Sequence, residues 1–589
     1  MWKTLSELLM SVPSMSRYIG RVKGRLLVLF CAMIAVLWGC KKSDSSQQTA
    51  RQPEMNAPNL VRIHWLGKKR ISAETNAAGF MQIWNLPETV RLEAQTLDKL
   101  ALALSTNLPG ATNTDKSLGG SSITNYAELI KGPSAILRPL LNDLVQEECY
   151  LQVRQATNEA WCLVLALRLN DARAGAWETN LAAAVESITG THPSSSADKH
   201  GWQAQIPRKG TRLNHHLLSA AGRVELARAA QWTLIGLAKD QNSLFEETVN
   251  RIKSGNERNP FNASTTNFWL EADLDLRTIG QEMAGWKLPQ NSPRISLTMI
   301  GDGMDVLTRA QIDFAEPPSF QIEPWKIPTN LIRGSLVSFS AVQGIKPWLS
   351  SISTLADLQL RDVPNQLFSW SQGGPIFRVY WAAPLENASN TVHVLTQQLI
   401  SKANTYLTNN SDSGKLEQPS NSNGVVWAEL GLAKPYLESV NTPQGEFITA
   451  GLSQALEENQ QLPPEILQQL LNRTNLVYYD WELTGGRIDD WIFMGQFFRF
   501  SLNRAQLRGA SPGLKWLSAL HTNLGNCVTA VMRPAPARLV LSRKSTFGMS
   551  AVELHLLVDW LESPEFPHGF YTLLAKPPLT DQPKAQPSK

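Results

Sequence analysis

Apolar and polar residues alternate along the chain in blocks that predict a mixture of strands and helices. Strand-like alternation begins at 60–65, and helical spacing of apolar residues follows over 87–104 and 134–145. The later segments FWLEADLDL and LVYYDWEL place apolar side chains on one face only, which is typical of antiparallel sheets with one covered face. We therefore expect an α+β fold in which helices pack on one face of antiparallel sheets.

The order of the predicted elements repeats along the chain. A hairpin, a helix that begins after Asn170, a polar loop, strands, a second helix and a strand follow one another, and the same order returns with a helix that begins after Asn387. In this alignment Gly236 corresponds to Gly451, and Asp273 to about Asp480. A repeat of this length indicates two related modules, the product of an internal duplication, and a chance likeness is the alternative. The two asparagines are interpreted as helix N-caps.

The expected organisation has six parts. They are a signal peptide (1–39), a flexible tether (40–57), a first α+β module (58–316), a proline-rich linker (317–328), a second α+β module (329–575) and a disordered tail (576–589).

Charge changes this picture only at the amino terminus. The chain has 55 Lys and Arg against 51 Asp and Glu, a formal net charge of +4. The leader and Cys40 hold this whole excess, so the expected mature chain is neutral. Because phosphate binding requires an excess of Lys and Arg, the sequence argues against a nucleic acid partner. The lack of any run of 18 apolar residues argues against a multi-span membrane protein.

The amino terminus carries the sharpest functional signal. Thirteen apolar residues at 26–38 follow three basic residues, a pattern typical of a secretory signal peptide and too short to span a membrane. The segment ends in Leu37-Trp38-Gly39-Cys40, which resembles the lipobox of bacterial lipoproteins, here of the large uncharacterised envelope type. A start at Met15 instead of Met1 would give this leader a basic region of ordinary length.

The resemblance implies that Cys40 is the lipidated first residue of the mature chain. Two or three acyl chains would then anchor the protein stably to a membrane of the cell envelope. In this family an Asp after the lipidated Cys resembles an inner-membrane retention signal, and this chain has Lys41. The resemblance thus favours the outer membrane if the host has two membranes. The alternative is an uncleaved signal anchor in which Cys40 has no role.

Three further cysteines fall outside the leader: Cys149, Cys162 and Cys527. The first two belong to a predicted hairpin, but a loop over 156–159 would place Cys149 opposite residue 166. A disulfide bond between them would need a shifted register, so we expect free thiols.

Local patterns of possible chemistry are sparse. Four of them are better explained by local structure: the solvated pair His215-His216, Ser196 and Lys199 in a predicted loop, Asp302 and Asp305 at a hairpin turn, and Asp489-Asp490 near a helix start. Of the 19 tryptophans, most lie in apolar strands, where packing in the core explains them. The sequence thus predicts no catalytic residue, no metal site and no cofactor.

These observations favour a non-catalytic binding or structural module of the envelope. Its partner would be an envelope protein, a polymer or an apolar ligand. One alternative is a hydrolase of envelope polymers with a carboxylate-based site, which an exposed pair of carboxylates in a cleft would favour. Another is a carrier of lipid or of an apolar ligand, which a continuous apolar cavity between the helices and the sheet would favour.

Overall fold

The computed structural model describes residues 59–106, 129–155, 161–190, 192–195, 201–206, 222–255, 268–282, 291–351, 362–373, 378–409, 415–420, 422–428, 434–453, 462–501, 511–563 and 566–567. The predicted signal peptide, Cys40, the tether and the tail lie outside these residues.

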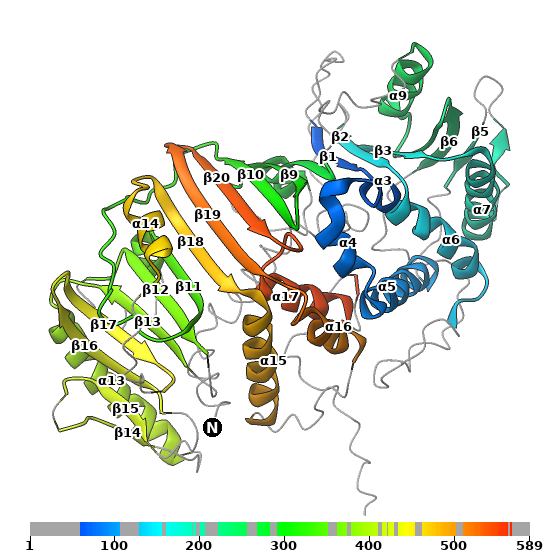
Figure 1. Ribbon diagram of the computed structural model, residues 1–589. Helices are drawn as coiled ribbons and strands as arrows, with labels where there is room; N and C mark the ends of the chain where they lie inside the picture. Colours follow the sequence, from blue (N-terminus) through cyan, green and yellow to red (C-terminus); the bar gives the residue numbers. More distant parts are fainter. Residues whose placement is uncertain are drawn as a thin grey trace, which may run out of the picture.

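Twenty strands of the described residues form one sheet (Figure 1). Every pair of neighbouring strands is antiparallel. The first ten strands are β1 (Asn59–Trp65), β2 (Cys149–Gln155), β3 (Trp161–Arg168), β4 (Ser194–Ser195), β5 (Gly201–Gln205), β6 (Arg223–Ala229), β7 (Trp232–Ala238), β8 (Leu270–Asp275), β9 (Arg294–Asp302) and β10 (Asp305–Asp313). The last ten are β11 (Leu336–Gln343), β12 (Gln366–Gln372), β13 (Val379–Pro384), β14 (Lys415–Glu417), β15 (Val425–Ala428), β16 (Tyr436–Thr442), β17 (Gly445–Gly451), β18 (Leu476–Leu483), β19 (Asn526–Ala535) and β20 (Arg538–Ser545).

Read outward from the middle of the sheet, the two halves have the same strand order. From edge to edge it runs β14-β15-β16-β17-β13-β12-β11-β18-β19-β20-β10-β9-β8-β1-β2-β3-β7-β6-β5-β4. Each pairing among the first ten strands recurs among the last ten with ten added to both strand numbers. The two halves meet at β10 and β20, where Ala310 lies opposite Leu541.

Helices of the described residues occupy the connections between strands. In the first half they are α3 (Lys68–Ile71), the 3-10 turn η1 (Thr75–Ala77), α4 (Ala78–Trp84), α5 (Pro87–Thr106), α6 (Pro133–Gln146), α7 (Asp171–Thr189), α9 (Ser243–Lys253) and α10 (Leu276–Glu282). In the second half they are α11 (Lys346–Ser350), α13 (Ala388–Asn409), α14 (Pro464–Leu471), α15 (Thr484–Ser501), α16 (Pro512–Leu520) and α17 (Ala551–Leu561). The predictions of α5 and α6 from apolar spacing are confirmed.

Helices cover both faces of the sheet, so the prediction that they pack on one face is wrong. Alternate residues of β3 face opposite sides: Leu163 and Leu167 pack with α7, whereas Val164 and Ala166 pack with α9. Strand β7 is buried along its whole length. A strand covered on both faces reads as a continuous apolar run instead of an alternating pattern.

Helices from both halves share one apolar cluster near the middle of the sheet. Ile83 of α4 and Leu92 of α5 pack with residues of α15, α16 and α17 (Figure 1). Across this cluster the Trp516 ring nitrogen donates a 2.8 Å hydrogen bond to the Thr89 hydroxyl, and Lys99 Nζ donates to the Leu561 carbonyl at 2.7 Å. The sheet and this helix cluster therefore both join the two halves.

Local predictions of turns and caps are mostly confirmed. The turn after Asp302 joins β9 to β10 as a hairpin, and the Asn170 side chain accepts a 2.9 Å hydrogen bond from the Arg173 N–H as an N-cap of α7. Asn387 instead takes the left-handed conformation, with φ of 58°, just before α13. Asparagine is one of the few non-glycine residues that adopt this conformation readily.

Among the described residues, no helix combines the length and the apolar character that crossing a membrane requires.

Candidate functional site: an apolar groove between α11 and α13

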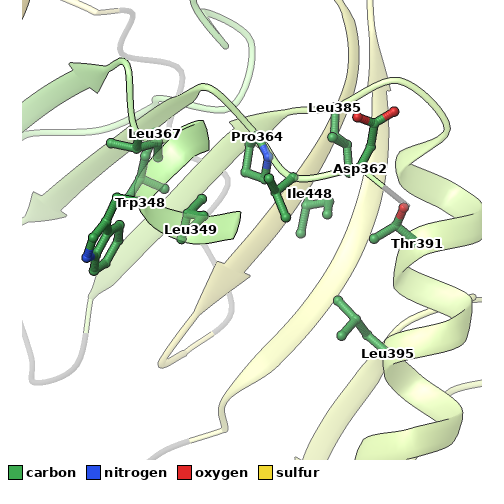
Figure 2. Close-up of a pocket in the computed structure, with 11 residues that line it drawn as sticks. Trp348, Leu349, Asp362, Pro364, Leu367, Leu385, Thr391, Leu395 and Ile448 are labelled. Carbon is green, nitrogen blue, oxygen red and sulfur yellow. The ribbon is translucent and has the colours of Figure 1, made fainter. Parts of the chain in front are cut away.

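A half-open groove of about 250 Å³ lies on the second half of the molecule, between α11 and α13 (Figure 2). Trp348 and Leu349 of α11 form one wall, and Thr391 and Leu395 of α13 lie across from them. Ile448 of β17 also lines the groove.

Two connections place the other lining residues. The segment that enters β12 contributes Asp362 and Pro364, and the turn from β13 into α13 contributes Leu385, which is buried. Asn387, two residues after Leu385, has a positive φ and turns the chain into α13. The lining is apolar except for Asp362, whose carboxylate pairs with Lys346 at 3.1 Å, and Thr391. Such a surface suits an apolar group far better than a polar one.

Trp348 is the aromatic side chain among the residues that line the groove. It is 46% exposed, whereas Trp232 of β7, Trp427 of β15 and Trp269, which directly precedes β8, are buried. The core interpretation of the strand tryptophans is thus confirmed for these three, and Trp161, Trp381 and Trp481 are half-buried. The sequence analysis missed Trp348. Its signal is its place in the short, proline-containing segment IKPWLS, where no strand would bury it.

Glycine fixes how the chain enters α11. Gly344 has φ of 82° and follows β11 directly, and its N–H donates a 2.9 Å hydrogen bond to the Asn365 carbonyl. A side chain there would collide with the ring of Phe320. In the first half, Gly67 lies two residues after the end of β1, has φ of 89° and leads into α3.

A buried polar cluster lies under the start of α17. Glu482 of β18 accepts a 2.7 Å hydrogen bond from the Ala551 N–H, and Asp480 accepts one of 2.5 Å from the Ser340 hydroxyl. Burial raises the pKa of Glu482 to about 7, and the neighbouring charge of Asp480 adds to this shift, while the hydrogen bond from Ala551 opposes it. Burial also raises the pKa of Asp480, against the opposing effect of Ser340.

Arg543 of β20 belongs to the same cluster. Its guanidinium binds the carboxylate of Glu553 through two hydrogen bonds of 2.5 and 2.9 Å, and its Nε donates to the Thr529 hydroxyl at 2.9 Å. These carboxylates thus have partners within the protein, and Glu482 is 3% exposed. The arrangement fastens α17 to the sheet; it is not the exposed pair in a cleft that would favour a hydrolase.

A second buried cluster lies on β1 and β2 of the first half. Glu148 binds His64 Nε2 at 3.1 Å and also the guanidinium groups of Arg70 and Arg168, at 2.5 and 3.2 Å. Burial alone would raise the pKa of Glu148, but the hydrogen bond from His64 and the charge of Arg70 outweigh it and hold the pKa below its usual value. The His64 ring stacks on Tyr150 with centroids 4.1 Å apart. This is a structural ion-pair network centred on Glu148.

The described residues account for two of the singled-out acidic pairs. Lys544 Nζ lies 2.9 Å from Asp302 and 3.8 Å from Asp305, so a cation of the protein itself pairs with both carboxylates of this turn. Asp489 and Asp490 lie in the second turn of α15, where Asp489 pairs with His521 at 2.7 Å. No group of three or more metal-ligating side chains occurs in the described ranges.

The three cysteines of the described residues, Cys149, Cys162 and Cys527, are free, as expected. The strand pairing places Cys149 opposite Leu167 and Cys162 opposite Arg154, so the two thiols are not neighbours. The predicted partner of Cys149, residue 166, is off by one because Gln155 pairs with Trp161, which makes the hairpin loop one residue longer than expected.

Several predicted sites fall outside the residues that the structure describes. They are Cys40, the pair His215-His216, Ser196 and Lys199.

Comparison with known proteins leaves the chain without assigned relatives. No family model and no curated protein matches it. A crystal structure of TP0453, in crystal form III, is similar at 10% sequence identity over 40% of this chain and 99% of that chain, with a TM-score of 0.18. A likeness with so low a TM-score supports no conclusion about fold or function.

Proposed function

We propose that this protein is a non-catalytic binding module of a bacterial cell envelope that takes an apolar group in the groove between α11 and α13. The groove itself carries the proposal. Apolar side chains from five separate parts of the second half converge there, and Trp348 leaves almost half of its surface exposed. Exposed apolar surface costs about 25 cal/mol per Å², so a gathered apolar surface of this kind is characteristic of a place that a ligand covers.

Membrane attachment is the second part of the proposal. Acyl chains on Cys40 would hold the module at a membrane, and the polar segment at 41–57 would serve as the tether. Lys41 supports an outer-membrane location in a host with two membranes. This part of the proposal rests on the lipobox alone.

We also infer that the two halves arose by duplication of one ten-strand unit. The recurrence of every strand pairing with ten added to the strand numbers supports this inference. Two further features agree with it: a glycine of positive φ follows both β1 and β11, and a long helix follows both β3 and β13. The proposed binding groove therefore belongs to one copy of a repeated unit.

Site-specific photo-crosslinking tests the binding proposal. Benzoylphenylalanine in place of Trp348 would sit in the groove, and the same residue in place of Met304, which is 58% exposed on the β9–β10 turn, is the matched control. After irradiation of living host cells, we expect a covalent adduct from position 348 and none from position 304. Equal yields at the two positions, or no adduct from position 348, would contradict the proposal.

A further inference from the structure

Strands β1 and β11 can be compared residue by residue. The shift in residue number that takes Gly67 to Gly344, two glycines of positive φ, also takes Val61 to Ser338. Just before Val61 the pairing of β1 with β2 is irregular, and the pairing of β11 with β12 is irregular just before Ser338. The strand pairings then extend the comparison from β1 and β11 to their neighbours in the sheet.

One face of the sheet is apolar in the first half and polar in the second. Val61 and Ile63 of β1 and their partners on β2 and β8 belong to one apolar cluster. The equivalent places on β11, β12 and β18 carry serines and carboxylates, which we call the polar row. The apolar six are Val61, Ile63, Val153, Leu151, Leu274 and Ala272, and their polar counterparts are, in the same order, Ser338, Ser340, Ser371, Ser369, Glu482 and Asp480.

The helices that meet this face also bind it differently in the two halves. In the first half, Leu140 of α6 and Trp177 of α7 belong to the same apolar cluster as the strands. In the second half, the Ala551 N–H of α17 donates to Glu482 at 2.7 Å, and Asp490 of α15 accepts a hydrogen bond from Ser371. Because water can replace such hydrogen bonds but cannot replace apolar contacts, the polar face is the easier one to separate from its helices.

Helices α15, α16 and α17 form one group, which we call the helix layer. Ile488 of α15, Leu517 of α16 and Leu554 of α17 belong to one apolar cluster. Ile83 and Leu92 of the first half are part of the same cluster. The helix layer therefore has an apolar support that does not depend on the polar row.

The junctions between the helix layer and the sheet lie at one end of the sheet. Strand β18 ends opposite the start of β19, and β20 ends beside them. Each junction contains glycine: Gly485 and Gly486 at the start of α15, Gly525 before β19, and Gly548, with φ of 78°, before α17. Hinges are often small residues at the ends of elements, where they absorb changes of φ and ψ.

We propose that the helix layer separates from the polar row in a local opening, hinged at these glycines, while the sheet stays folded, and that ionisation of Glu482 favours the open form. Opening breaks the hydrogen bond between Glu482 and Ala551. This device does not depend on the binding groove, so failure of the crosslinking test would leave it unaffected.

The groups around Glu482 set the direction of the pH effect. Burial raises its pKa to about 7 against the hydrogen bond from Ala551; the charge of Asp480 adds to this shift, and Arg487 and Thr484 oppose it. In the open form water restores the usual 4.5. The closed form is therefore favoured most below pH 4.5, and this advantage is lost as pH rises through 7. The other titratable groups at this place are Arg543, Glu553 and Cys527.

Cys527 is a native reporter of the opening. It lies opposite Glu482 on β19 and is fully buried, and burial raises its pKa to about 12, so the closed form should not react with a thiol reagent. The matched control is Ile295→Cys in a Cys527→Ser background, because Ile295 lies opposite Leu274, the counterpart of Glu482. We would treat the full-length protein with N-ethylmaleimide and follow each cysteine by peptide mass spectrometry, relative to the urea-unfolded protein at the same pH.

At pH 8 we expect Cys527 to react at least about tenfold faster than the thiol of Ile295→Cys, and with a weaker dependence on dilute urea, because a local opening exposes less surface than unfolding. Its rate relative to the unfolded protein should rise about tenfold from pH 6 to pH 8, and Glu482→Gln should remove this rise. Equal rates with equal urea dependence would overturn the opening. A rise that persists in Glu482→Gln would overturn the role of Glu482.

Hydrogen exchange of the wild type makes the same comparison without a substitution. Amides of α17 should exchange at least about tenfold faster than those of α7, again with a weaker dependence on dilute urea. Equal protection of the two helices would overturn the proposal as well.

Discussion

The carboxylate of Glu482 accepts a 2.7 Å hydrogen bond from the backbone N–H of Ala551, which joins strand β18 to the first residue of helix α17. The acceptor is buried and lies on the same face of β18 as Asp480, whose charge opposes its ionisation. A carboxylate at a helix N-terminus is favoured by the helix dipole. Burial nevertheless dominates here and leaves the pKa at about 7.

This relationship predicts how stability depends on pH. Because the folded pKa of about 7 lies above the usual 4.5, the folded protein holds this proton more tightly than the unfolded chain. The stabilisation is complete below pH 4.5 and is lost as pH rises through 7, at most about 3 kcal/mol. Glu482→Gln keeps an acceptor without a charge, so its free energy of unfolding should fall less from pH 5 to pH 8 than that of the wild type.

Urea unfolding at both pH values measures the difference. Glu417→Gln on β14 is the control, because the Glu417 side chain is 48% exposed. If Glu482→Gln and the wild type lost equal stability between pH 5 and pH 8, Glu482 would not control this pH dependence.

Local sequence patterns predicted individual elements well because short-range chemistry determines them. Proline at the start of α5 and the Asn170 cap of α7 are local signals, and their helices begin at Pro87 and Asp171. The hairpin after Asp302 is likewise determined by residues that are adjacent in sequence. The order of elements in the two halves could be seen before any pairing was known.

The pairing of the two halves could not be predicted in this way. Strands β10 and β20 lie more than 200 residues apart in sequence, and the sequence pattern of neither strand indicates that the two are neighbours. The expectation of one covered face came from the alternating patterns of β8 and β18, whereas β7 is buried on both sides. Whether a strand is covered on one face or on both depends on the helices that pack against the sheet, which is a property of the tertiary structure.

The groove escaped prediction for a related reason. Trp348, Leu385, Leu395 and Ile448 come from separate elements and share no motif. A sequence pattern describes one segment at a time, so a surface assembled from separate segments becomes visible only in the folded chain.

If Cys40 is lipidated, substitutions of Cys31 and Cys40 should have different effects on labelling and on membrane attachment. Metabolic labelling with a clickable palmitate should label the wild type and Cys31→Ala, because Cys31 lies within the signal peptide that is removed. Cys40→Ala should carry no label and should leave the membrane fraction. An unlabelled wild type, or a Cys40→Ala variant that stays membrane-bound, would favour an uncleaved anchor over a lipobox.

Two glycines within helices predict opposite effects of the same substitution. At Gly79 of α4, a Cβ atom would lie 2.2 Å from the backbone oxygen of Met304, so Gly79→Ala must displace either the helix or the β9–β10 turn. At Gly175 of α7, nothing lies within 4 Å of a new Cβ atom. Alanine is favoured over glycine in a helix by about 0.5–1 kcal/mol, so Gly175→Ala should raise the free energy of unfolding by that amount. Gly79→Ala should lower it by about 1–3 kcal/mol, as overpacking does. Thermal or urea unfolding of the two variants compares them directly, and a stabilised Gly79→Ala would mean that α4 does not rest against this turn.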